Sequence, residues 1–147
     1  MPHRDIDHLV QALLPSAKEH LTRERTLHPF GSAMTPEGEM VTLRHGHGHT
    51  RERLKSMGEQ LRAEMAAGEI RAGALCMSVH TLEPGRGRKV HAICIAVEHQ
   101  NGEGLDYYVP YRRGWFGRYH FGRPFGQPRA SVLSPASRAN PNGARAR

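Results

Sequence analysis

The chain has 147 residues, of which 37% are hydrophobic, and a formal net charge of +7 at pH 7. This length suits one domain that folds without needing disulfides or metals. Residues 1–110 hold 13 Lys and Arg and all 14 Asp and Glu, whereas residues 111–147 hold eight Arg and no acidic residue. The nearly neutral body argues against a uniformly basic nucleic-acid surface, and a basic extension of this kind usually stays solvated.

Hydropathy and cysteine content point to a cytoplasmic protein without a membrane partner. No apolar stretch approaches the roughly 18 residues that a membrane span requires, and no early segment has the pattern of a secretion signal. The chain has two cysteines, Cys76 and Cys94. Without a secretion signal we expect them to be reduced thiols.

Two helices are predicted from apolar residues at helical spacing. The first is marked by Ile6, Leu9, Val10, Leu13, Ala17 and Leu21. Asp5 is placed to cap its first turn, and Pro15 predicts either a kink or two short helices. The second runs from a Thr50 cap to about Ala67, and Gly68 ends it. Its buried stripe is predicted to be Leu54, Met57, Leu61 and Met65.

Five strands are predicted from apolar runs and turn residues. His28–Thr35 and Glu39–Arg44 flank a Pro-Glu-Gly turn, Ile70–Thr81 and Lys89–Gln100 flank a Gly-rich loop, and Leu105–Tyr111 follows Asn101-Gly102. Consecutive hairpins favour an antiparallel sheet. We therefore expect one α+β domain over residues 1–111, in the order α-β-β-α-β-β-β, with a five-stranded, mainly antiparallel sheet and both helices on one face.

Beyond Tyr111 the sequence changes character. Residues 112–128 interleave Gly and Arg with aromatic residues, and residues 129–147 are rich in Ala, Ser, Pro, Asn and Arg. We expect 112–128 to be an extension and 129–147 to be a disordered basic tail. The aromatic rings either pack back onto the sheet or stack on the bases of a single-stranded nucleic acid.

Histidines alternate with glycines at His45, His47 and His49. Imidazoles at this spacing could converge on zinc, copper or nickel. No cysteine or carboxylate accompanies them at a familiar ligand spacing, so a polar loop between strand and helix is the favoured interpretation. We expect no metal and no cofactor.

The two cysteines lie on neighbouring predicted strands. If these strands pair symmetrically about Gly85, Cys76 and Cys94 face each other with their Cβ atoms about 5 Å apart. A redox pair is then conceivable, but there is no Cys-x-x-Cys motif to lower a thiol pKa. Two small core residues are the better explanation.

Catalytic motifs are missing from the sequence. It contains no Gly-x-Ser-x-Gly, no His-Glu-x-x-His and no phosphate-binding Gly-x-x-x-x-Gly-Lys. Gly85 and Gly87 lie in a predicted hairpin loop, which is not where a nucleotide-binding fingerprint occurs. The sequence therefore favours a protein that is not an enzyme.

Three short segments resemble a pattern of small bacterial α+β proteins. They are Pro29-Phe30-Gly31 with Glu37-Gly38-Glu39 at the following turn, the strand Ala92–His99, and Tyr108-Val109-Pro110-Tyr111. Some proteins of this kind are similar to immunity proteins that neutralise a partner toxin. The resemblance covers roughly residues 5–111, and it implies a style of fold but no functional residue.

The leading hypothesis is a non-enzymatic module that binds a protein partner, such as an immunity or accessory protein. An exposed sheet face or edge could serve this contact or form a homodimer. Because Tyr, Trp and Arg dominate binding hot spots, we predict that the contact residues are Tyr107, Tyr108, Tyr111, Arg112, Arg113 and Trp115. One alternative is nucleic-acid binding through the Arg-rich and aromatic tail. Another is a metal-dependent enzyme that uses the histidine loop.

Overall fold

The computed structural model describes residues 2–43 and 49–130. It contains two long helices, α1 (Pro2–Glu24) and α2 (Thr50–Ala66), and a short 3₁₀ turn, η1 (Trp115–Gly117). Seven strands form one sheet, so the α+β class is confirmed and the expected count of five is too low. The strands are β1 (Phe30–Met34), β2 (Met40–Thr42), β3 (Ala72–Leu82), β4 (Lys89–His99), β5 (Glu103–Arg113), β6 (Tyr119–Phe121) and β7 (Phe125–Ala130).

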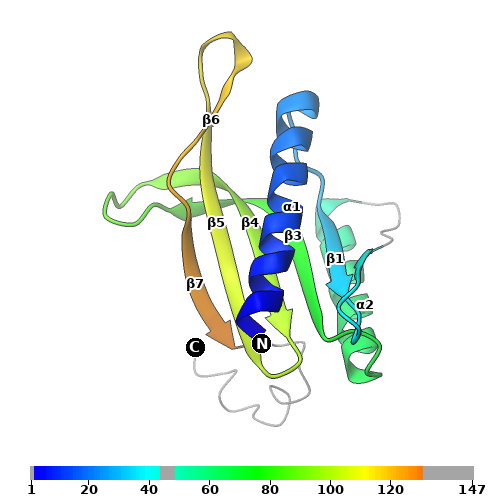
Figure 1. Cartoon of the computed structure of the whole chain (residues 1–147). Helices are drawn as coiled ribbons and strands as arrows, with labels where there is room; N and C mark the ends of the chain where they lie inside the picture. The colour runs from blue at the N-terminus through cyan, green and yellow to red at the C-terminus, as the bar shows by residue number, and fades with distance from the viewer. Residues whose placement is uncertain (1, 44–48, 131–147) are drawn as a thin grey trace.

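The sheet is antiparallel and curled, with the strand order β2-β1-β3-β4-β5-β6 (Figure 1). Strand β7 pairs with β5 as well, alongside Glu103–Tyr108, while β6 pairs with Tyr111–Arg113. The outer neighbour of β5 is thus one strand in two pieces. The boundary that we expected at residue 111 falls inside β5, and part of the predicted extension is paired with the sheet.

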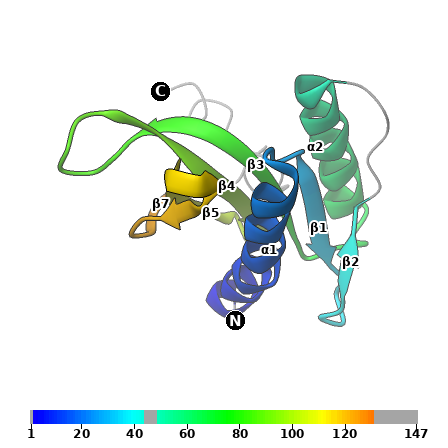
Figure 2. The same cartoon turned by 90° about the horizontal axis from the view of Figure 1, so that it is seen from above.

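The two helices lie on opposite faces of the sheet, not on one face as expected. Helix α1 packs on a core that includes Ala72, Ala74 and Cys76 of β3, whereas Leu75 of the same strand packs against the α2 cluster. Seen from above, β1 runs between α1 and α2 (Figure 2). Consecutive small or apolar residues in β3 explain this arrangement, because a strand buried on both faces loses the polar alternation.

Helix α1 is continuous through Pro15, so the alternative with two short helices is wrong. Asp5 lies inside its first turn instead of capping it. In α2 the expected stripe is confirmed, with Met57, Leu61 and Met65 fully buried and Leu54 packed beside them. The cap residue is His49 and not Thr50. Gly68 ends the helix with a positive φ of 75°.

The register of β3 and β4 separates the two cysteines, so the predicted pairing is wrong. Cys76 is opposite Ile95, and Cys94 is opposite Met77. The cause lies in the hairpin loop, which closes with the Glu83 N–H donating to the Arg88 carbonyl oxygen at 3.0 Å. The centre of symmetry therefore lies just after Gly85. A one-residue offset moves a side chain to the other face, so the thiols point to opposite sides of the sheet.

Candidate functional site: an arginine fork and an aromatic tip

Two hairpins diverge at one end of the sheet. The β3–β4 hairpin projects to the left in Figure 1, and the β5–β6 hairpin projects upward. Pairing between β4 and β5 ends at His91 and Tyr111, after which the strands separate. The space between the hairpins is a pocket of about 350 Å³. We call it the arginine fork; its lining residues are Glu83, Arg86, Arg88, Val90, Pro110, Tyr111, Arg112, His120, Phe121, Gly122 and Arg123.

The arginine fork keeps a net positive charge, because four arginines outnumber its acidic groups. Of the described residues that line it, Glu83 alone carries a carboxylate. Glu83 Oε1 lies 3.7 Å from Nε of Arg86 and 3.7 Å from Nε of Arg88. These distances are longer than hydrogen bonds. Both guanidinium groups are well exposed, so the fork has the planar donors that bind phosphate well.

Pro110 of β5 lies opposite the break between β6 and β7. Its carbonyl oxygen accepts a hydrogen bond of 2.7 Å from Gly122 N–H, just where β6 ends. In an antiparallel strand the N and O of one residue point the same way, so the missing N–H of Pro110 faces this break. The turn from β6 toward β7 places Arg123 in the fork.

The β5–β6 hairpin ends in two exposed rings, Trp115 and Phe116, which we call the aromatic tip. Their exposed fractions are 87% and 97%. The other rings of residues 112–128 pack on the sheet: Tyr119 and Phe121 contact the α1 core, and Phe125 stacks on Tyr108 with centroids 5.0 Å apart. The rings of Tyr119, Phe121 and Phe125 thus follow the first alternative, whereas stacking of Trp115 and Phe116 on bases stays a prediction.

The six predicted contact residues do not form one surface. Tyr107 packs against the α1 core. Tyr108 is on the opposite face of the strand, and the Tyr111 hydroxyl lies 2.6 Å from Ser78 Oγ. The last four, Tyr111, Arg112, Arg113 and Trp115, lie on the β5–β6 hairpin, and of these Tyr111 and Arg112 line the arginine fork. Sequence reasoning missed Arg86, Arg88, Arg123 and Phe116, since three of them reach the site only through the topology of the sheet.

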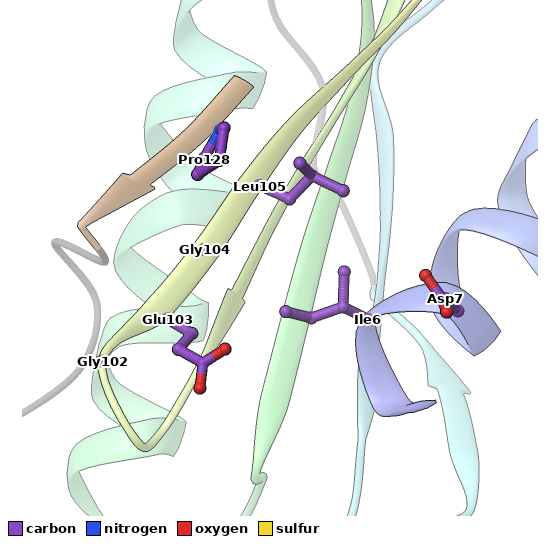
Figure 3. Close-up of a pocket in the computed structure, with 7 residues that line it drawn as sticks. All are labelled: Ile6, Asp7, Gly102, Glu103, Gly104, Leu105 and Pro128. Atoms are coloured by element: carbon purple, nitrogen blue, oxygen red, sulfur yellow. The ribbon is translucent and has the colours of Figure 1, made fainter. Parts of the chain in front are cut away.

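A second pocket of about 520 Å³ lies between α1 and the start of β5 (Figure 3). We call it the N-terminal pocket; its lining residues are Ile6, Asp7, Gly102, Glu103, Gly104, Leu105 and Pro128. Ile6 and Leu105 supply apolar side chains, and Asp7 and Glu103 supply carboxylates. Its described lining contains no basic residue, so this pocket would repel a phosphate group.

A buried polar network lies near the same end. The Asp5 carboxylate is 2.9 Å from His99 Nε2 and 2.9 Å from Arg71 Nη2. Burial by itself opposes ionisation of Asp5, but these hydrogen bonds and the nearby positive charge outweigh it and hold its pKa below the usual range. Arg71 also donates to the Pro36 carbonyl oxygen at 2.9 Å. The network therefore ties α1 to the turn before β2 and to the ends of β3 and β4.

This network does not have the geometry of a catalytic dyad. The Asn101 N–H donates to His99 Nδ1 at 3.2 Å, so Nε2 carries the proton and donates to Asp5. Both ring nitrogens are thus used, and only 6% of His99 is exposed. No nitrogen of His99 is left to accept a proton from a substrate.

The metal hypothesis rests mostly on residues outside the described chain. His45 and His47 lie outside it, so the three-histidine arrangement stays a prediction. Within residues 2–43 and 49–130, no group of three or more His, Cys, Asp or Glu could hold a metal ion. Nor is any helix of that part long and apolar enough to cross a membrane.

Comparisons with known proteins leave the site to be interpreted from its own geometry. No protein-family model matches the chain, and neither a curated protein nor a solved structure does so. The resemblance to immunity proteins therefore stays a prediction.

Proposed function

We propose that this protein binds nucleic acid through the arginine fork. The observation that supports this most is the concave pocket itself, where four arginines and His120 converge from two hairpins. A guanidinium group can donate two parallel hydrogen bonds to the oxygens of one phosphate, and a nucleic-acid backbone offers phosphates at regular intervals. The neutrality of residues 1–110 does not oppose this, because the positive charge is concentrated at one end of the sheet.

The charge of the segment distinguishes nucleic acid from a protein partner. Trp and Arg also form protein-binding hot spots, which was the basis of the leading sequence hypothesis. Residues 111–147, however, contain eight arginines and no acidic residue. A segment with charges of one sign favours a polyanion, since typical protein interfaces are depleted in charge at their centre.

The shape of the site favours nucleic acid over an anionic membrane. A bilayer is flat on the scale of this pocket, so it cannot follow the space between the two hairpins that the arginines line. A flexible strand can enter the fork. Vesicles that contain anionic lipid are therefore the control ligand, and we expect them to bind more weakly than an oligonucleotide at equal salt.

The test measures the affinity of the full chain for labelled oligothymidylate at several salt concentrations. For a single strand the logarithm of affinity should fall with a slope of about −0.7 per phosphate contact, or about −3 for four arginines. The double variant Arg112→Gln/Arg123→Gln should reduce this slope by about 1.4. The matched control Arg4→Gln/Arg51→Gln changes the charge equally at two exposed positions away from the fork.

Two results would overturn the proposal. The first is an absence of oligonucleotide binding at low salt, which would restore the protein-binding hypothesis. The second is an equal loss of affinity in both double variants, because net charge alone would then account for binding.

A further inference from the structure

The aromatic tip combines full exposure with an unfavourable backbone. Phe116 has φ 60° and ψ 25°, in the left-handed region. Bulky residues rarely occur there, and glycine or asparagine is the usual occupant. Phe116 is 97% exposed, so packing within the chain does not compensate for this conformation. A strained residue without internal contacts points to a role outside the folded chain.

The tip is held in place from two sides. The Gly114 N–H donates to the Arg118 carbonyl oxygen at 2.6 Å and closes the turn. Arg25, the residue that follows α1, donates from Nη1 to the Gly117 carbonyl oxygen at 3.4 Å. A Cβ at Gly117 would lie 2.5 Å from the same Nη1 atom. Helix α1 thus supports the turn, and a supported turn loses less entropy when it binds.

We infer that the aromatic tip is a stacking platform for the bases of single-stranded nucleic acid, whose phosphates lie in the arginine fork. This inference rests on the proposed function and specifies its ligand. Pairing places Arg112 opposite His120 and Arg113 opposite Tyr119, so the hairpin that carries the tip also forms one side of the fork. Stacking requires an exposed base face, which a single strand offers and an intact duplex hides.

The chain contains its own reporter for this contact. Trp115 is the only tryptophan among the 147 residues. A base stacked on its ring should quench its fluorescence directly. Oligothymidylate should therefore quench the emission, whereas a duplex of matched length that binds through the fork alone should leave it nearly unchanged.

The variants separate stacking from folding. Phe116→Gly removes one ring and relieves the left-handed backbone, so we expect an equal or higher Tm together with a loss of single-strand affinity. Trp115→Ala removes the second ring, and each ring should account for a roughly 5- to 100-fold change in Kd. Val41→Ala, which trims an exposed apolar residue on β2, is the control and should leave affinity unchanged. Duplex affinity and its salt slope should stay as in the unmodified protein for all three.

Each outcome has a separate meaning. Quenching by the single strand alone, with weaker binding in both ring variants, supports the inference. Equal binding of single strand and duplex, without quenching and without an effect of Phe116→Gly, overturns it but leaves the fork as a duplex site. A lower Tm in Phe116→Gly shows that the ring stabilises the fold and overturns the strain argument. If neither nucleic acid binds, the proposed function itself is wrong.

Discussion

The polar side chains near the two halves of β5 differ in their partners: near one half they bond to one another, and near the other half they face solvent. Near Glu103–Tyr108 the strand is paired with β7, and the neighbouring Asp5, His99 and Arg71 satisfy one another by hydrogen bonds. Near Tyr111–Arg113 the strand is paired with β6, and its Arg112 lines an open pocket. Polar groups that satisfy each other stabilise a fold, whereas exposed groups of one sign remain available to a ligand.

The largest expected effect comes from ending the chain after residue 111. This removes β6, β7 and the end of β5, and it leaves β5 as an exposed edge. We expect this shorter chain to melt without cooperativity and to aggregate, as measured by circular dichroism and light scattering. A chain that ends after residue 130 retains both strands and is the matched control. If the shorter chain melts as cooperatively as this control, β6 and β7 contribute little to the fold.

The next largest effect should follow removal of the buried carboxylate. Asp5→Ala leaves His99 and Arg71 without their shared acceptor, and it should reduce the free energy of unfolding by about 3 kcal/mol in urea titrations. Asp7→Ala, at an exposed neighbour in the N-terminal pocket, should change it little. Equal unfolding curves for the two variants would show that the network does not stabilise this end.

The pH dependence of stability should sharpen the same contrast. Because the pKa of Asp5 is lowered in the folded chain, its ionised form stabilises the fold at any pH above the unfolded carboxyl pKa of about 3.9. This contribution is lost as the pH falls from there through the folded pKa. The difference in unfolding free energy between the unmodified protein and Asp5→Asn should be constant near neutrality and shrink in acid. A difference that is flat into strong acid would contradict the assignment.

The smallest effect concerns the cysteines. Burial, followed by the neighbouring Cys94, raises the pKa of the Cys76 thiol far above its usual range. We expect both thiols to react with a thiol reagent only after denaturation, and mild oxidation to form no Cys76–Cys94 disulfide in the folded chain. Mass spectrometry after oxidation would measure this, with the denatured chain as control. A rapid disulfide in the native protein would show that the register is wrong.

The helix α2 was predictable because its buried stripe repeats at helical spacing. Strands β3, β4 and β5 were predictable because a turn signal separates each from the next. The opposite faces of the two helices could have been inferred from the run of small and apolar residues in β3. Strands β6 and β7 were not predictable: Gly122, Pro124, Gly126 and Pro128 give this stretch little strand propensity. They form because β5 offers an unpaired edge.

The candidate site was predicted only where it is local in sequence. Arg112, Arg113 and Trp115 lie on one hairpin, so composition alone located them. Arg86 and Arg123 are far apart in the chain, and only the divergence of β4 from β5 brings them to one pocket. The exposure of Phe116 depends on a single backbone conformation that no composition rule predicts.

The two outermost strands of the sheet also determine how this chain behaves toward copies of itself. Strand β2 has only three residues. On the other side, β6 and β7 are interrupted at Gly122–Pro124, and β7 contains Pro128, which cannot donate to a further strand. Short or proline-bearing margins are poor templates for edge-to-edge growth. The protein can therefore expose Trp115 and Phe116 in concentrated solution while the edges of its sheet resist pairing with other copies.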